Sequence, residues 1–126
     1  MQATRSYEDI LAWQKAHTFV IEAYRVIAGF PDYERFGLCS QFRRAAVSIP
    51  ANIAEGYKKL GKSDKLRFFN IAQGSLEECR YYCLLAKDLN YIDGQRFLSL
   101  VDCIEEASRF LNSYIKCVVN NSGTRD

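Results

Sequence analysis

The sequence predicts an all-α protein: an antiparallel four-helix bundle with up-down-up-down order. Apolar residues recur at spacings of three and four along four long segments, which is the periodicity of amphipathic helices. The 126 residues include only two prolines and seven glycines, so little interrupts these segments. Short connections between helices of similar length favour antiparallel neighbours. We expect a single domain over residues 1–126, with helices at about 7–28, 40–60, 64–89 and 94–120.

The first helix is expected over residues 7–28. Ser6 is a candidate N-cap, and Asp9 follows it at the spacing of a capping box, with Asp in place of the usual Glu. Gly29 can adopt the left-handed conformation that closes a helix, and Pro31 prevents further propagation.

The second helix, over residues 40–60, combines two contrasting faces. An interior proline costs about 3 kcal/mol and kinks a helix, so Pro50 requires a compensating reason. Packing around neighbouring helices is one explanation, and a freed carbonyl near Ala46 that accepts from a partner or ligand is the other. Gly56, and Gly74 in the next helix, predict close approach of another helix or subunit. The apolar face consists of Leu38, Phe42, Ala46, Ile49 and Ile53.

The third and fourth helices have clear start and stop signals. Ser63 is the expected N-cap of the helix over 64–89, and Asn90 its C-cap. Asp93 is the expected N-cap of the helix over 94–120. The core face of the third helix is Phe69, Ala72, Leu76, Cys79, Cys83 and Ala86.

The sequence contains more apolar residues than a bundle core needs, above all in the third helix. A bundle helix requires roughly three apolar positions in seven. The surplus can widen the core, or it can form a subunit interface, where aromatic residues are enriched. We therefore expect a homo-oligomer. The surplus residues are Phe19, Tyr24, Phe68, Ile71, Tyr81, Tyr82, Leu84, Leu85, Phe97, Phe110 and Tyr114.

No pattern of catalytic or metal-binding residues is visible. His17 is the single histidine, and we expect it on the surface. Cys79 and Cys83 share a helix face, but a structural zinc site needs four ligands. The chain has no Glu-x-x-His repeat of the di-metal bundles. We expect neither enzymatic activity nor a metal or cofactor.

Three features of the sequence favour a cytoplasmic protein that is not in a membrane. The five cysteines have no framework spacing, the N-terminus has no apolar signal segment, and no apolar run approaches 20 residues.

Positive charge is concentrated in about a quarter of the sequence, residues 35–67. Residues 35–67 contain eight basic and two acidic residues, whereas the whole chain has a net charge of +2. Such asymmetry predicts an acidic partner: RNA, DNA or an acidic protein surface. The candidate nucleic-acid-binding residues are Arg43, Arg44, Lys58, Lys59, Lys62, Lys65 and Arg67. Ordinary solubilising charge is the alternative.

The second helix carries a polar stripe, and the third helix carries a second polar group. They form either a solvated face or a hydrogen-bonded network between helices or subunits, because buried polar groups are tolerated only when paired. The residues of this candidate structural network are Ser48, Asn52 and Glu55, together with Gln73, Ser75 and Glu78.

Two segments, RRAAVSIPANIAEGY at 43–57 and FFNIAQGSLEE at 68–78, resemble the bacterial four-helix bundle family encoded in intervening sequences of 23S rRNA genes. The resemblance extends from about Leu11 to Val118. Similar proteins accompany diversity-generating retroelements. The resemblance implies a ring-shaped homopentamer and makes structured RNA a plausible partner.

The residues and the resemblance together lead to one functional expectation and one alternative. We expect a non-enzymatic oligomeric bundle that binds nucleic acid, foremost RNA, or a nucleoprotein through its basic residues. The alternative is a protein-interaction scaffold that docks an enzyme such as a reverse transcriptase and has no direct nucleic-acid role.

Overall fold

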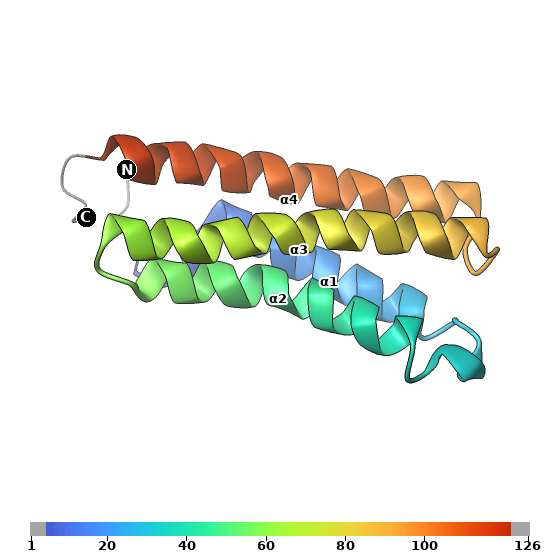
Figure 1. Cartoon of the computed structure of the whole chain (residues 1–126). Coiled ribbons are helices and arrows are strands. Elements are labelled where there is room, and N and C mark those ends of the chain that lie inside the picture. The colour runs from blue at the N-terminus through green and yellow to red at the C-terminus, as the bar shows by residue number, and fades with distance from the viewer. Residues whose placement is uncertain (1–4, 122–126) are drawn as a thin grey trace.

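The computed structural model describes residues 5–121, and these form an all-α four-helix bundle without a strand. The helices are α1 (Leu11–Ile27), α2 (Leu38–Lys58), α3 (Lys62–Asp88) and α4 (Gly94–Asn120) (Figure 1). Two short 3-10 helices, η1 (Tyr7–Asp9) and η2 (Asp32–Glu34), precede α1 and α2. The expected all-α class and number of helices are therefore confirmed.

Each helix packs against two others. α2 contacts α1 and α3, and α4 contacts the same two helices from the other side. The start of α1, the α2–α3 turn and the end of α4 lie at one end of the bundle, whereas η2 and the α3–α4 turn lie at the other (Figure 1). Basic residues of the α2–α3 turn are thereby brought next to the first and last described elements.

The core lies along the axis between the four helices. All the predicted core residues of α2 and α3 are buried. Phe19 and Tyr82, which were counted as surplus, are also core residues, with exposed fractions of 0% and 8%. Part of the aromatic surplus therefore widens the core, and burial of each large side chain contributes about 1.5–3 kcal/mol. Tyr24 and Tyr81 remain about half exposed, at 45% and 57%.

The N-terminal boundary of the first helix differs from the prediction. The hydroxyl of Ser6 accepts a backbone N–H of η1, so this residue caps the 3-10 helix. Ile10 is extended, with φ −80° and ψ 122°, and α1 begins only at Leu11. Asp9 accepts the backbone N–H of Arg5 rather than completing a capping box. The capping signal was real, but it belongs to a separate turn.

Other helix ends show which turn signals were reliable. Asp93 caps α4 as predicted and accepts a first-turn N–H at 2.7 Å. Asn90, just beyond α3, has a left-handed φ of 63°. Gly29 does not adopt this conformation, since no described glycine has a positive φ. Gly61 rather than Ser63 occupies the N-cap position of α3.

The two glycines inside helices have different environments. A Cβ added to Gly56 would lie 2.5 Å from the ring of Phe69, so the predicted close approach of α2 and α3 occurs here. No atom lies within 4 Å of a Cβ built at Gly74, which faces open space in the single chain. Pro50 is buried, and α2 continues through it.

Over residues 5–121, no helix combines the length and apolar character needed to span a bilayer.

Candidate nucleic-acid interface

A small polar cluster lies between α2 and α3. The hydroxyl of Ser75, 7% exposed, donates to Ser48 Oγ at 2.9 Å. The side-chain amide of Asn52 donates to the same Oγ at 2.9 Å and to the Ser48 carbonyl at 2.7 Å. Three of the six residues of the predicted polar network are thus in direct contact, and their hydrogen bonds are made within the bundle.

The other three residues of that set lie elsewhere. Gln73 donates to Asn112 of α4 at 2.8 Å. Glu78 accepts the hydroxyl of Tyr82 at 2.6 Å. Burial, aided by this hydrogen bond, raises the pKa of Tyr82 to about 12. Glu55 is exposed and has no hydrogen-bond or ion-pair partner among residues 5–121. The six residues therefore form separate contacts rather than one connected network in the single chain.

The predicted basic set divides into two groups. Arg44 and Lys58 are fourteen positions apart on α2, which corresponds to about 21 Å along the helix. Arg43 and Arg44 therefore lie well away from the α2–α3 turn. The five basic residues near that turn are Lys58, Lys59, Lys62, Lys65 and Arg67.

Two of the lysines at the turn bind the carbonyl ends of helices. The Lys65 amine donates to the carbonyls of Tyr57 at 2.7 Å and Gly56 at 3.3 Å, and burial lowers its pKa. The Lys62 amine donates to the Val119 carbonyl of α4 at 3.1 Å. Cations at helix C-termini compensate unpaired carbonyls and the negative end of the helix dipole. These two lysines thus have a structural role.

The remaining cations of the turn surround an aromatic ring. The amine of Lys59 lies 5.0 Å from the centre of the Phe68 ring, and the guanidinium carbon of Arg67 lies 4.8 Å from it. Arg67 also pairs with Asp64 at 3.7 Å, with both side chains largely exposed. Lys58, which precedes Lys59 in the chain, is exposed. This group, Lys58, Lys59, Arg67 and Phe68, is called the basic turn below.

The sequence reasoning identified the cations but missed their aromatic and N-terminal neighbours. Phe68 directly follows Arg67, and alternation of basic and aromatic residues was a usable signal. Arg5 and Tyr7 had no such signal, because η1 comes next to α2 only in the folded chain.

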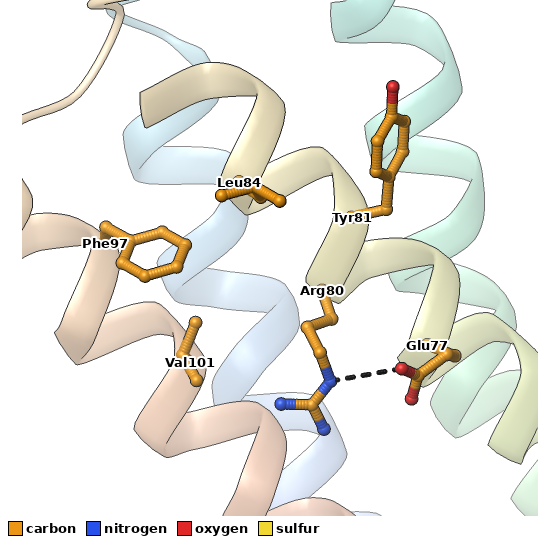
Figure 2. A pocket seen from close by; sticks show the side chains of 6 residues that line it. All are labelled: Glu77, Arg80, Tyr81, Leu84, Phe97 and Val101. Carbon is orange, nitrogen blue, oxygen red and sulfur yellow. Dashed lines mark ion pairs between the residues drawn. The ribbon is translucent and has the colours of Figure 1, made fainter. Parts of the chain in front are cut away.

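A second surface feature is an exposed groove of about 480 Å³ between α3 and α4. Leu84, Phe97 and Val101 form its apolar part, and the ring of Tyr81 points away from them (Figure 2). The guanidinium of Arg80 pairs with Glu77 at 3.4 Å on its edge. The lining residues are Glu77, Arg80, Tyr81, Leu84, Phe97 and Val101. Apolar surface of this kind is typical of contacts with another protein chain.

The residues that could support catalysis or metal binding are dispersed. His17 is exposed and stacks on Trp13, with 5.0 Å between ring centres. Cys79 and Cys83 are buried, and burial raises the pKa of the Cys83 thiol to about 12. Cys117 is exposed. Over the described range, no group of three His, Cys, Asp or Glu residues could hold a metal ion.

Fold and surface together define an all-α four-helix bundle protein with a basic turn at one end. The model of the 23S rRNA-intervening sequence protein family matches residues 8–113, and the chain belongs to this family. Its fold is similar to the crystal structure of a protein of unknown function from the S23 ribosomal protein family of Bacteroides thetaiotaomicron VPI-5482, with a TM-score of 0.78 at 24% identity. That match covers 84% of this chain and 99% of the other. No curated protein matches the sequence.

Proposed function

We propose that this protein is a non-enzymatic, cytoplasmic, homo-oligomeric bundle that binds nucleic acid, foremost structured RNA, through the basic turn. The observation that supports this most directly is the gathering of Lys59 and Arg67 around the ring of Phe68, next in the chain to the exposed Lys58. Cations on one surface bind phosphates without needing a sequence motif. The family is named for intervening sequences of 23S rRNA, which makes structured RNA the first nucleic acid to test.

The oligomer in this proposal is a ring-shaped homopentamer of antiparallel up-down-up-down bundles. Successive turns lie at opposite ends of the bundle, which supports the up-down-up-down order of the helices. The apolar groove between α3 and α4 supports an interface with another copy of the chain. A ring would repeat the basic turn around an axis, so that weak phosphate contacts add by avidity. Light scattering tests this: a mass five times the 14.5 kDa of the chain supports the pentamer, and a monomer rejects it.

The RNA-binding proposal is tested by fluorescence anisotropy with a labelled RNA hairpin over a range of salt concentrations. We expect wild-type affinity to fall steeply with salt, with a slope of about 0.9 per phosphate contact on a log–log plot. The double variant Lys58→Gln/Lys59→Gln should bind more weakly and with a smaller slope. Glutamine removes the charge without adding an anion at the C-terminus of α2.

A matched control removes two cations at the opposite end of the bundle. Arg35 and Arg96 are both exposed, and the variant Arg35→Gln/Arg96→Gln should bind RNA as the wild type does. Equal losses in both double variants would indicate a general charge effect and would contradict a localised site. If no RNA binds even at low salt, the alternative, a scaffold that docks an enzyme such as a reverse transcriptase, is favoured. A nuclease-resistant protein pull-down would then identify its partner.

A further inference from the structure

A pocket of about 410 Å³ lies beside the basic turn, between η1 and the last turns of α2. Its volume falls in the range of roughly 300–1,000 Å³ typical of small-ligand sites. Lys58 belongs both to this pocket and to the basic turn, so the two surfaces are continuous. The lining residues are Arg5, Ser6, Tyr7, Ala54, Glu55, Tyr57 and Lys58.

Aromatic rings and cations meet in this pocket. Tyr7 is 37% exposed, and its ring is held edge-on to Trp13 with 5.1 Å between ring centres. Tyr57 provides a second ring, with the Lys65 amine 5.7 Å from its centre. The Arg5 side chain is 77% exposed and its Nε pairs with the exposed Asp9 carboxylate at 3.9 Å, a long surface ion pair that leaves the guanidinium able to reach a ligand. Aromatic faces and flexible cations are the groups that bind the bases and phosphates of single-stranded nucleic acid.

Glu55 makes this pocket more than a general anion site. Its carboxylate is exposed and unpaired within residues 5–121, and it would repel a simple phosphate. A carboxylate can only accept hydrogen bonds, so it favours a ligand edge that presents donors. A ligand that fits all the lining residues has a negative group, a flat ring and a donor edge. A nucleotide has all three, and among the bases guanine presents adjacent N–H donors on its Watson–Crick edge.

We propose that this pocket binds one unpaired nucleotide of the RNA strand that lies on the basic turn, with a preference for guanine. Arg5 and Lys58 contact the phosphates, a tyrosine ring stacks on the base, and Glu55 accepts from the base edge. This inference rests on the proposed function, and it adds recognition of an unpaired base to binding of the RNA backbone.

The test compares three labelled RNA hairpins that share one stem: a blunt hairpin, one with a short guanosine overhang and one with a uridine overhang. We expect the guanosine overhang to tighten wild-type binding about tenfold over the blunt hairpin, since one stacked base is worth about that factor. Tyr7→Leu should lower this preference to about twofold or less and leave affinity for the blunt hairpin unchanged.

Further variants separate ring, carboxylate and fold effects. Tyr7→Phe keeps the ring and should restore the overhang preference. Glu55→Gln should reduce discrimination between guanosine and uridine. Tyr24→Leu removes an exposed tyrosine from the middle of the bundle and should change nothing.

The outcomes distinguish the inference from the proposed function. If the blunt hairpin binds with a steep salt dependence and the overhang adds nothing, the pocket proposal is overturned and backbone binding stands. A uniform loss of affinity for all three hairpins in Tyr7→Leu would also overturn it. If no hairpin binds at low salt, the proposed function and the pocket proposal both fail.

Discussion

Two polar regions on α2 and α3 differ in where their interaction partners lie. In the cluster of Ser48, Asn52 and Ser75, the Ser75 hydroxyl bonds to Ser48 Oγ across the two helices at 2.9 Å, and the Asn52 amide bonds to the Ser48 carbonyl and Oγ within α2 at 2.7 and 2.9 Å. At the basic turn, Lys58 is exposed at the end of α2, and the half-buried Lys59 places its amine over the Phe68 ring without a carboxylate or carbonyl partner among residues 5–121. The cluster aligns two helices, whereas the turn keeps binding capacity for a partner outside the chain.

The comparison shows that polar periodicity alone does not separate these two roles. Residues Ser48, Asn52, Glu55 and Lys59 follow one another at helical spacing on a single stripe. Ser48 and Asn52 form hydrogen bonds in the polar cluster, whereas Glu55 has no such partner among residues 5–121 and the Lys59 amine lies over the Phe68 ring. The expected effects of mutation should therefore change from loss of stability to loss of binding along this stripe.

The largest expected effect is on the inner side of α3, one residue beyond the polar cluster. Leu76 is 2% exposed, and Leu76→Asp would bury an unpaired carboxylate among apolar side chains. We expect a loss of about 4 kcal/mol or more in the free energy of unfolding, enough to abolish cooperative folding. A circular-dichroism melt tests this, with Asn70→Asp on the exposed side of α3 as control. A native melt of Leu76→Asp would refute the core assignment.

The second-largest expected effect is on the polar cluster of Ser48, Asn52 and Ser75. Asn52→Leu removes two hydrogen bonds to Ser48, and we expect a loss of about 1.5 kcal/mol, or about 5 °C in Tm. Glu55→Leu makes the same kind of change three positions further along the stripe, where no bond is lost, and should leave Tm unchanged within about 1 °C. Equal Tm values for Asn52→Leu and the wild type would show that the cluster has no structural role.

The sequence was sufficient for the helices and most of the core because helical periodicity marks the buried face directly. All six predicted core residues of α3, from Phe69 to Ala86, are buried. The sequence was insufficient for the site, because a residue that contacts another helix has no feature nearby in the sequence that identifies its partner. Lys62 binds a carbonyl 57 positions away, and nothing near it in the sequence distinguishes it from Lys58. The sequence likewise does not show which aromatic residues join the core, as Phe19 does, because that depends on how the helices pack together.

The smallest expected effect separates the two kinds of lysine at the basic turn. Lys65→Met removes the amine that binds the carbonyls of Gly56 and Tyr57. Because a cation at a helix C-terminus is worth about 0.3–1 kcal/mol, we expect Tm to fall by about 2–3 °C. RNA affinity should change little, since this amine already has partners within the chain.

Lys58→Met is the matched change on an outward-facing lysine and should give the reverse result. The exposed Lys58 amine binds no described carbonyl, so thermal unfolding should be unchanged while salt-dependent RNA binding weakens. Both lysines lie within eight residues of each other and carry the same charge, so net charge cannot explain opposite outcomes. If both variants lost only stability, the turn would be a structural element. If both lost only binding, the carbonyl contacts of Lys65 would have no measurable role in holding α2.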